Sequence, residues 1–179
     1  MKQALIVIDV QNDYFEGGAM SLVHPEQALQ HIQQLERWFF AQNLPIIYIQ
    51  HINSAQASFF LPDTDGVALH PQLQLQSNSI ILQKHKPNSF LGTDLDQILQ
   101  QLSVDQLVVT GMMTHMCIDS TTRAATELGY QPILIADATA TRDLSFNGQS
   151  TSAHDVQTAF LAALSNFATI QKTHQFIQA

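Results

Sequence analysis

Short apolar segments alternate along the chain with segments of helical periodicity. The apolar segments cover residues 4–8, 45–49, 80–82, 107–109, 133–135 and, more weakly, 168–171. Between them, apolar residues recur at spacings of three and four in segments that start near residues 25, 93, 117 and 153. This alternation is typical of βαβ units and predicts an α/β fold with a doubly wound parallel sheet of five or six strands.

The first apolar segment, residues 4–8, is continuous, which is expected of a strand that is covered on both faces. It ends abruptly at Asp9. Residues 53–78 contain Pro62, Gly66 and Pro71 and show no clear period, so we expect a long loop that covers a site. Residues 137–152 form a polar stretch in which the pattern predicts no regular element.

Length and composition predict one folded domain over residues 1–179, because 45% of the residues are hydrophobic and only 12% are charged. The net charge of −8 and the absence of a basic run argue against a nucleic-acid partner. No signal-peptide pattern or membrane span is recognisable, so we expect a cytoplasmic protein without a membrane partner. Its single cysteine, Cys117, excludes an internal disulfide and a cysteine-cluster metal site.

Three reactive residues stand where predicted strands end, namely Asp9, Lys84 and Cys117. Ligands of open α/β sheets bind at this edge. We expect Lys84 and a helix N-terminus to lower the pKa of the Cys117 thiol, and Asp9 to accept the thiol proton. Taken singly, Cys117 is better explained as a core residue among methionines, and Lys84 is explained equally well as a surface charge beside Lys86. The joint placement indicates nucleophilic catalysis.

Three ordered blocks resemble the isochorismatase-like cysteine hydrolase family over essentially the whole chain: residues 9–15 (DVQNDYF), 84–95 (KHKPNSFLGTDL) and 108–117 (VVTGMMTHMC). The resemblance implies a three-layer αβα sandwich with a Rossmann-like sheet and an Asp-Lys-Cys triad at Asp9, Lys84 and Cys117. Lys84 is preferred to Lys86 because it precedes the phenylalanine of the second block, Phe90, by the family's six residues.

The resemblance also implies a cis peptide between Met112 and Met113, and an oxyanion hole formed by the amides of Met113 and Cys117. Candidate substrate-binding residues are Tyr14, Phe15, His51, Phe90 and His115, with Phe59 and Phe60 as further apolar walls. His51 is expected either to line the pocket or to support it by hydrogen bonds, and His115 to be a polar wall or an interface residue.

Departures from the family pattern narrow the range of reactions that we expect. The metal set of nicotinamidases is missing, since residues 48–53 offer only His51, and no cofactor or metal is implied. Isochorismatases replace the nucleophilic cysteine, so Cys117 favours hydrolysis of a C–N bond in a small amide, carbamoyl or ureido substrate through a thioester. The alternatives are an isochorismatase-type or nicotinamidase-type hydrolase, or a non-catalytic or redox thiol protein. A phospho-receiver domain needs a phospho-accepting aspartate after the third strand and a lysine after the fifth, whereas here Lys84 and Asp137 follow these strands.

Family members are commonly dimers or tetramers, so we expect a homo-oligomer.

Overall fold

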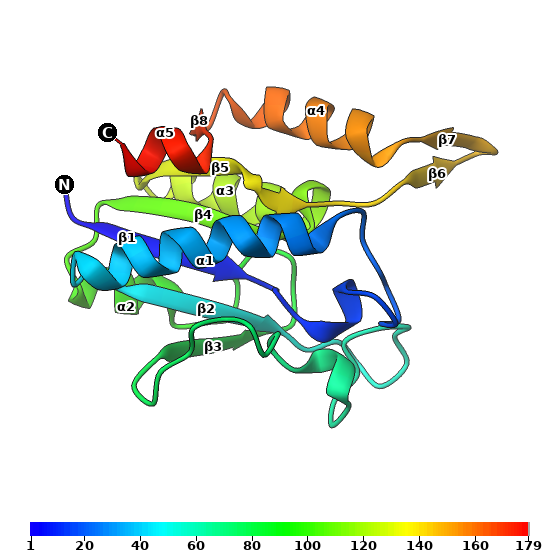
Figure 1. Cartoon of the computed structure of the whole chain (residues 1–179), viewed down its shortest axis with the longest axis horizontal. Helices are drawn as coiled ribbons and strands as arrows, with labels where there is room; N and C mark the ends of the chain where they lie inside the picture. Colours follow the sequence, from blue (N-terminus) through cyan, green and yellow to red (C-terminus); the bar gives the residue numbers. More distant parts are fainter. Residues whose placement is uncertain (179) are drawn as a thin grey trace.

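A six-stranded parallel sheet forms the centre of the protein, whose computed structural model describes residues 1–178 (Figure 1). The strand order is β3-β2-β1-β4-β5-β8. The α/β class and the doubly wound parallel sheet predicted from the sequence are confirmed. The strands are β1 Gln3–Ile8, β2 Ile46–His51, β3 Ile80–Lys84, β4 Gln106–Met112, β5 Gln131–Ala140 and β8 Thr169–Gln171.

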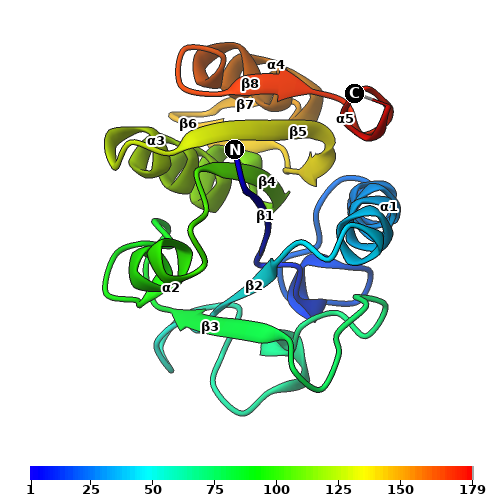
Figure 2. The same cartoon turned by 90° about the vertical axis from the view of Figure 1, so that its left-hand side faces the viewer.

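Helices cover both faces of the sheet, which gives the expected three layers (Figure 2). Leu5 and Val7 of β1 belong to the core cluster that contains the apolar face of α1, whereas Ile6 and Ile8 belong to the cluster on the other face. This burial on both sides explains why the strand sequences are continuously apolar. On the first face lie α1 Pro25–Ala41 and α5 Thr173–Ile177, and on the second lie α2 Leu95–Gln101, α3 Asp119–Glu127 and α4 Ala153–Leu164.

The polar stretch 137–152 is more regular than predicted. Strand β5 continues to Ala140, and β6 Leu144–Phe146 pairs with β7 Gln149–Thr151 as an antiparallel hairpin that extends from the body of the molecule (Figure 1). Its turn residues Asn147 and Gly148 both have positive φ, and an Asn-Gly pair is a strong hairpin signal that apolar periodicity does not capture. The short helix α5 was not predicted either.

The carboxyl ends of β1, β2, β3 and β4 meet at one edge of the sheet (Figure 1). Gly111 allows β1 and β4 to approach there, because a Cβ at this position would overlap the backbone of Ile8 and its φ of 119° is unfavourable for other residues. Residues 53–78 return to this edge, where Leu69 bridges to Gln11. No helix within residues 1–178 is long and apolar enough to cross a membrane.

Candidate active site

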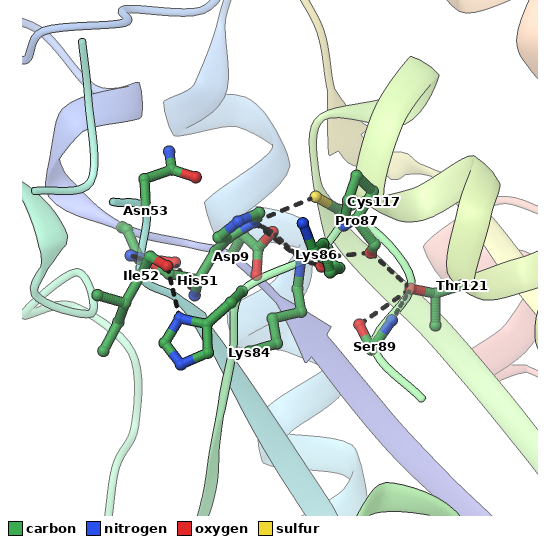
Figure 3. Close-up of polar contacts among 12 residues, drawn as sticks. Asp9, His51, Ile52, Asn53, Lys84, Lys86, Pro87, Ser89, Cys117 and Thr121 are labelled. Atoms are coloured by element: carbon green, nitrogen blue, oxygen red, sulfur yellow. Dashed lines mark hydrogen bonds and ion pairs between the residues drawn. The ribbon is translucent and has the colours of Figure 1, made fainter. Parts of the chain in front are cut away.

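Asp9, Lys84 and Cys117 converge at this edge of the sheet (Figure 3). Asp9 directly follows β1, Lys84 is the last residue of β3, and Cys117 lies in a π-helical turn, Thr114–Ile118, between β4 and α3. The Lys84 Nζ atom is 2.9 Å from Asp9 Oδ2, and both side chains are fully buried. The side chains that the sequence singled out are therefore one cluster, although they are far apart along the chain.

Lys84 is held by several acceptors besides Asp9. Its Nζ atom donates to the backbone carbonyls of Lys86 at 3.1 Å and of Pro87 at 3.3 Å. Burial opposes the charged form of Lys84, but Asp9 and Cys117 outweigh it, so the pKa of the Lys84 ammonium lies above its ordinary value. The side chain of Lys86 is exposed, as its position beside Pro87 predicts.

Asp9 keeps one carboxylate oxygen available for proton transfer. Its backbone adopts a left-handed conformation with φ 53°, and its amide donates to the Ile49 carbonyl at 3.0 Å. Oδ2 takes part in the ion pair with Lys84, whereas Oδ1 is buried and has no hydrogen-bond partner among residues 1–178. An unpaired buried oxygen is unfavourable at rest and is well placed to receive a proton.

The thiol of Cys117 differs from the prediction. Burial and the negative charge of Asp9 raise its pKa well above the ordinary value, and the opposing effect of Lys84 is smaller. The side chain is 3% exposed, and α3 begins two residues later, at Asp119, so Cys117 is not the first residue of a regular helix. The expected lowering of the thiol pKa is therefore wrong, and these surroundings favour the neutral thiol over the thiolate.

His51 lies at the centre of the cluster. Its Nδ1 atom is 3.1 Å from Lys84 Nζ, 3.6 Å from Asp9 Oδ2 and 3.7 Å from Cys117 Sγ. Because an ammonium has no acceptor, the contact with Lys84 requires Nδ1 to accept and the ring proton to reside on Nε2. Gln11 fixes the backbone of His51 through two hydrogen bonds, of 2.7 Å to its N–H and 2.9 Å to its carbonyl.

Asp9, His51 and Cys117 also form the one group within residues 1–178 whose ligand atoms lie close enough together for a metal ion, within 4.8 Å. The Lys84 ammonium already contacts two of these ligand atoms. A metal ion at this point would face that positive charge at short range. His70, the other candidate imidazole, instead packs on the ring of Phe15 at 4.0 Å. The donor set and the ammonium together do not fit a metal centre.

The peptide between Met112 and Met113 is cis, as the resemblance implied. Met113 is 5% exposed and precedes the π-helical turn that carries Cys117. The Met113 carbonyl accepts from the amides of Met116 at 3.0 Å and Ile118 at 3.3 Å, which closes the turn. The turn thus brings the two residues expected to form the oxyanion hole, Met113 and Cys117, close together.

The candidate pocket residues lie in different surroundings. Tyr14 is buried against Phe60 at 4.5 Å between ring centroids, and burial followed by the charge of Asp9 raises its pKa well above the ordinary value. His115 lies 2.6 Å from the Thr141 hydroxyl. Phe90, in contrast, stacks on Tyr130 at 5.9 Å and packs against the core cluster beneath α2 and α3.

Sequence reasoning missed the residues that support the cluster. Gln11 also donates to the Val67 carbonyl at 2.8 Å, and Asp13 accepts from the Phe60 amide at 2.6 Å, so both tie residues 53–78 to the end of β1. Thr121 accepts from the Ser89 amide at 3.0 Å and thereby links α3 to the segment that holds Lys84 (Figure 3). The sudden polarity of residues 9–13 after an apolar strand was the available signal.

Known proteins resemble the chain over its full length. The isochorismatase domain family matches residues 3–175. An isochorismatase family protein of Bacillus subtilis, YddQ, is 43% identical over 99% of this chain and 100% of its own. A solved structure from Oleispira antarctica, described as an isochorismatase hydrolase, has a TM-score of 0.96 at 41% identity and covers 99% of this chain and 97% of its own.

A relative with a named reaction is the ureidoacrylate amidohydrolase RutB of Serratia proteamaculans. It is 35% identical over 89 residues, which is 50% of this chain and 36% of that enzyme. The family match, the full-length relatives and the buried Asp-Lys-Cys cluster agree with one another. The chain belongs to the isochorismatase family of hydrolases.

Proposed function

We propose that the protein is a cysteine hydrolase that cleaves the C–N bond of a small amide, carbamoyl or ureido compound. The observation that carries the proposal is the buried Lys84–Asp9 ion pair beside the Cys117 thiol. An acid, a cation and a nucleophile enclosed together are the parts of an activated-nucleophile mechanism. The amidohydrolase activity in the name of the relative RutB supports the same reaction class.

In the proposed reaction, the Cys117 sulfur attacks the substrate carbonyl while its proton passes to Asp9. The amides of Met113 and Cys117 stabilise the oxyanion that forms. Asp9 then protonates the leaving nitrogen, the C–N bond breaks, and a thioester remains. Water adds to the thioester, Asp9 takes a proton from it, and the thiol is restored as the acid leaves. The sum is substrate plus water giving an acid and an amine or ammonia.

The raised pKa of the Cys117 thiol favours this mechanism over the redox alternative. Redox-sensing cysteines are accessible thiolates of low pKa, whereas Cys117 is buried and its surroundings favour the neutral thiol. A neutral thiol needs a base during attack, and Asp9 has the free oxygen for that role. Lys84 acts as the electrostatic organiser, because its charge stabilises both the carboxylate and the thiolate that develops.

The test is amine or ammonia release from a panel of small amides, ureas and carbamoyl compounds. The wild-type protein should hydrolyse at least one of them, and Cys117→Ala should abolish that release. Hydroxylamine added during turnover should yield the hydroxamate of the acyl group, because it intercepts a thioester. Release that survives Cys117→Ala, or a purified protein that is inert on the whole panel, would contradict the proposal.

A further inference from the structure

A cavity of about 420 Å³ lies between the starts of α1 and α4 and the last residues of β5 (Figure 1). Three histidines line it. His24 directly precedes α1, His31 lies seven residues further along the same helix, and His154 is in the first turn of α4. Within the described chain, the lining includes no side chain of the proposed triad. The cavity is therefore distinct from the cluster of reacting groups.

The carboxylate of Asp137, on β5, orients the ring of His31. Asp137 Oδ1 accepts from the amide and from the hydroxyl of Thr173, both at 2.8 Å, whereas Oδ2 faces His31 Nδ1 at 3.8 Å. His31 Nδ1 is buried and has no hydrogen-bond partner among residues 1–178. Because an ionised carboxylate can only accept, this pair favours a proton on Nδ1 and leaves Nε2 free to bind a ligand. Metal-binding histidines usually donate their other ring N–H to such a carboxylate.

The charges around the cavity favour a cation. Asp137 contributes a carboxylate to the lining, which contains no lysine or arginine of the described residues. In the active site, by contrast, Asp9 and His51 offer the same types of donor, but the Lys84 ammonium contacts both of them. Imidazole nitrogens are good ligands of Zn²⁺, Ni²⁺ and Cu²⁺, and three of them with a water molecule complete a tetrahedral zinc site.

We propose that His24, His31 and His154 bind a divalent transition-metal ion, and that Asp137 positions the ring of His31. The three ring nitrogens do not all lie within 4.8 Å of one another in the structure. The side chains of His24 and His154 are exposed, so they can rotate toward His31 on the picosecond-to-nanosecond timescale of surface side chains. The bound ion ties the starts of α1 and α4 together and takes no part in the hydrolysis.

The test is metal binding by untagged protein that carries Cys117→Ala, so that the thiol cannot act as a ligand. After dialysis against EDTA, Zn²⁺ is titrated by calorimetry and Co²⁺ by its visible absorbance, which is intense only in tetrahedral surroundings. We expect one ion of either metal per chain. Zn²⁺ should also raise the midpoint of urea unfolding, because it binds the folded protein.

Variants of the cavity should weaken this binding. Asp137→Asn should lower the affinity for Zn²⁺ by about 10–100-fold, which is the usual effect of removing the partner of a metal-binding histidine. His24→Gln, His31→Gln and His154→Gln should each lower it at least as much, because each removes a ligand. His174→Gln is the matched control, since this exposed histidine lies on α5 and outside the lining, and it should leave the affinity unchanged.

Absence of binding at one ion per chain, or equal affinities in the control and in the three lining variants, would overturn the inference. A loss confined to one of these variants would overturn the three-imidazole site. An unchanged affinity in Asp137→Asn would refute the positioning role of that carboxylate. If His31→Gln does not fold, His24→Gln and His154→Gln decide the question, because both change exposed side chains.

Discussion

Two fully buried carboxylates of this protein have different partners. Asp9 Oδ2 lies 2.9 Å from the Lys84 ammonium. Glu36, on α1, accepts instead from the Tyr48 hydroxyl at 2.7 Å and from the Gln74 amide at 2.9 Å. Among the described residues, Glu36 Oε2 has no hydrogen-bond partner, and Asp9 Oδ1 has neither a hydrogen bond nor an ion pair. The difference is therefore a cation at one site and neutral donors at the other.

That difference determines what each carboxylate can do. Burial raises the pKa of Glu36, and the hydrogen bonds from Tyr48 and Gln74 offset this only in part. Glu36 joins α1, β2 and the segment 53–78, which is a structural role. Asp9 has a compensating charge and a nucleophile beside it. Burial alone thus does not make a carboxylate reactive. The group that pairs with the carboxylate determines whether it can take part in chemistry.

The largest expected effect comes from removing the two carboxylates in turn. Asp9→Asn should lower turnover by about 10²–10⁴-fold, because it removes the proposed proton acceptor. Glu36→Gln should change turnover little. Both rates are measured by amine release, with circular dichroism as the check on folding. Comparable losses in the two variants would show that Asp9 has no special role.

A second comparison concerns the cation and uses the two nearby lysines, Lys84 and Lys86. Lys84→Ala should destabilise the protein by about 3–5 kcal/mol in urea unfolding, because it leaves the buried charge of Asp9 without a partner, and should lower turnover by orders of magnitude. Lys86→Ala removes an exposed side chain and should stay within about 0.5 kcal/mol of the wild type. The reverse order of effects would refute the assignment of Lys84.

The charge of Asp9 can also be detected at the thiol. Thiolate absorbance in the ultraviolet, taken as the difference from Cys117→Ala, should be absent near neutral pH and appear only above the range of an ordinary thiol, because burial and Asp9 raise the Cys117 pKa. Asp9→Asn should move this titration to lower pH, whereas Glu36→Gln should not move it. A thiolate already present at pH 7 in the wild type would contradict the neutral resting state.

A smaller effect is expected from Glu36 on the pH dependence of the free energy of unfolding. Its pKa is raised in the folded state, so the folded protein binds more protons than the unfolded chain between the ordinary and the raised pKa. The free energy of unfolding of the wild type should therefore fall, relative to Glu36→Gln, as the pH rises through that window. The fall amounts to about 1.4 kcal/mol for each pH unit that separates the two pKa values. Urea unfolding from pH 4 to pH 8 measures it, and parallel curves would disprove the raised pKa of Glu36.

The smallest expected effect is that of removing divalent ions, which tests whether Lys84 is the cation that Asp9 requires. Dialysis against EDTA should leave amine release unchanged, because the ammonium already contacts Asp9 and His51. Loss of the rate with EDTA and its return with zinc would mean that a metal ion takes this place, and nicotinamide would then become a candidate substrate.

Much of the molecule followed from local patterns. Continuous apolar segments predicted the parallel strands, because these are buried on both faces, and their ends located Asp9 and Lys84. The hairpin β6–β7 was not predicted because its strands have three residues each and mostly exposed side chains, so they show no apolar period. Helix α5 has five residues, which is too short for a helical period.

The sequence by itself determined the order of elements and the residue types at the strand ends, since these depend on periodicities of a few residues. Only the tertiary structure decided their electrostatics. Whether Cys117 is a thiol or a thiolate depends on burial and on the balance between Asp9 and Lys84, which come from different strands. Desolvation and pairing are properties of the packed surroundings and not of the chain, so they are known only when every neighbour of a side chain is known.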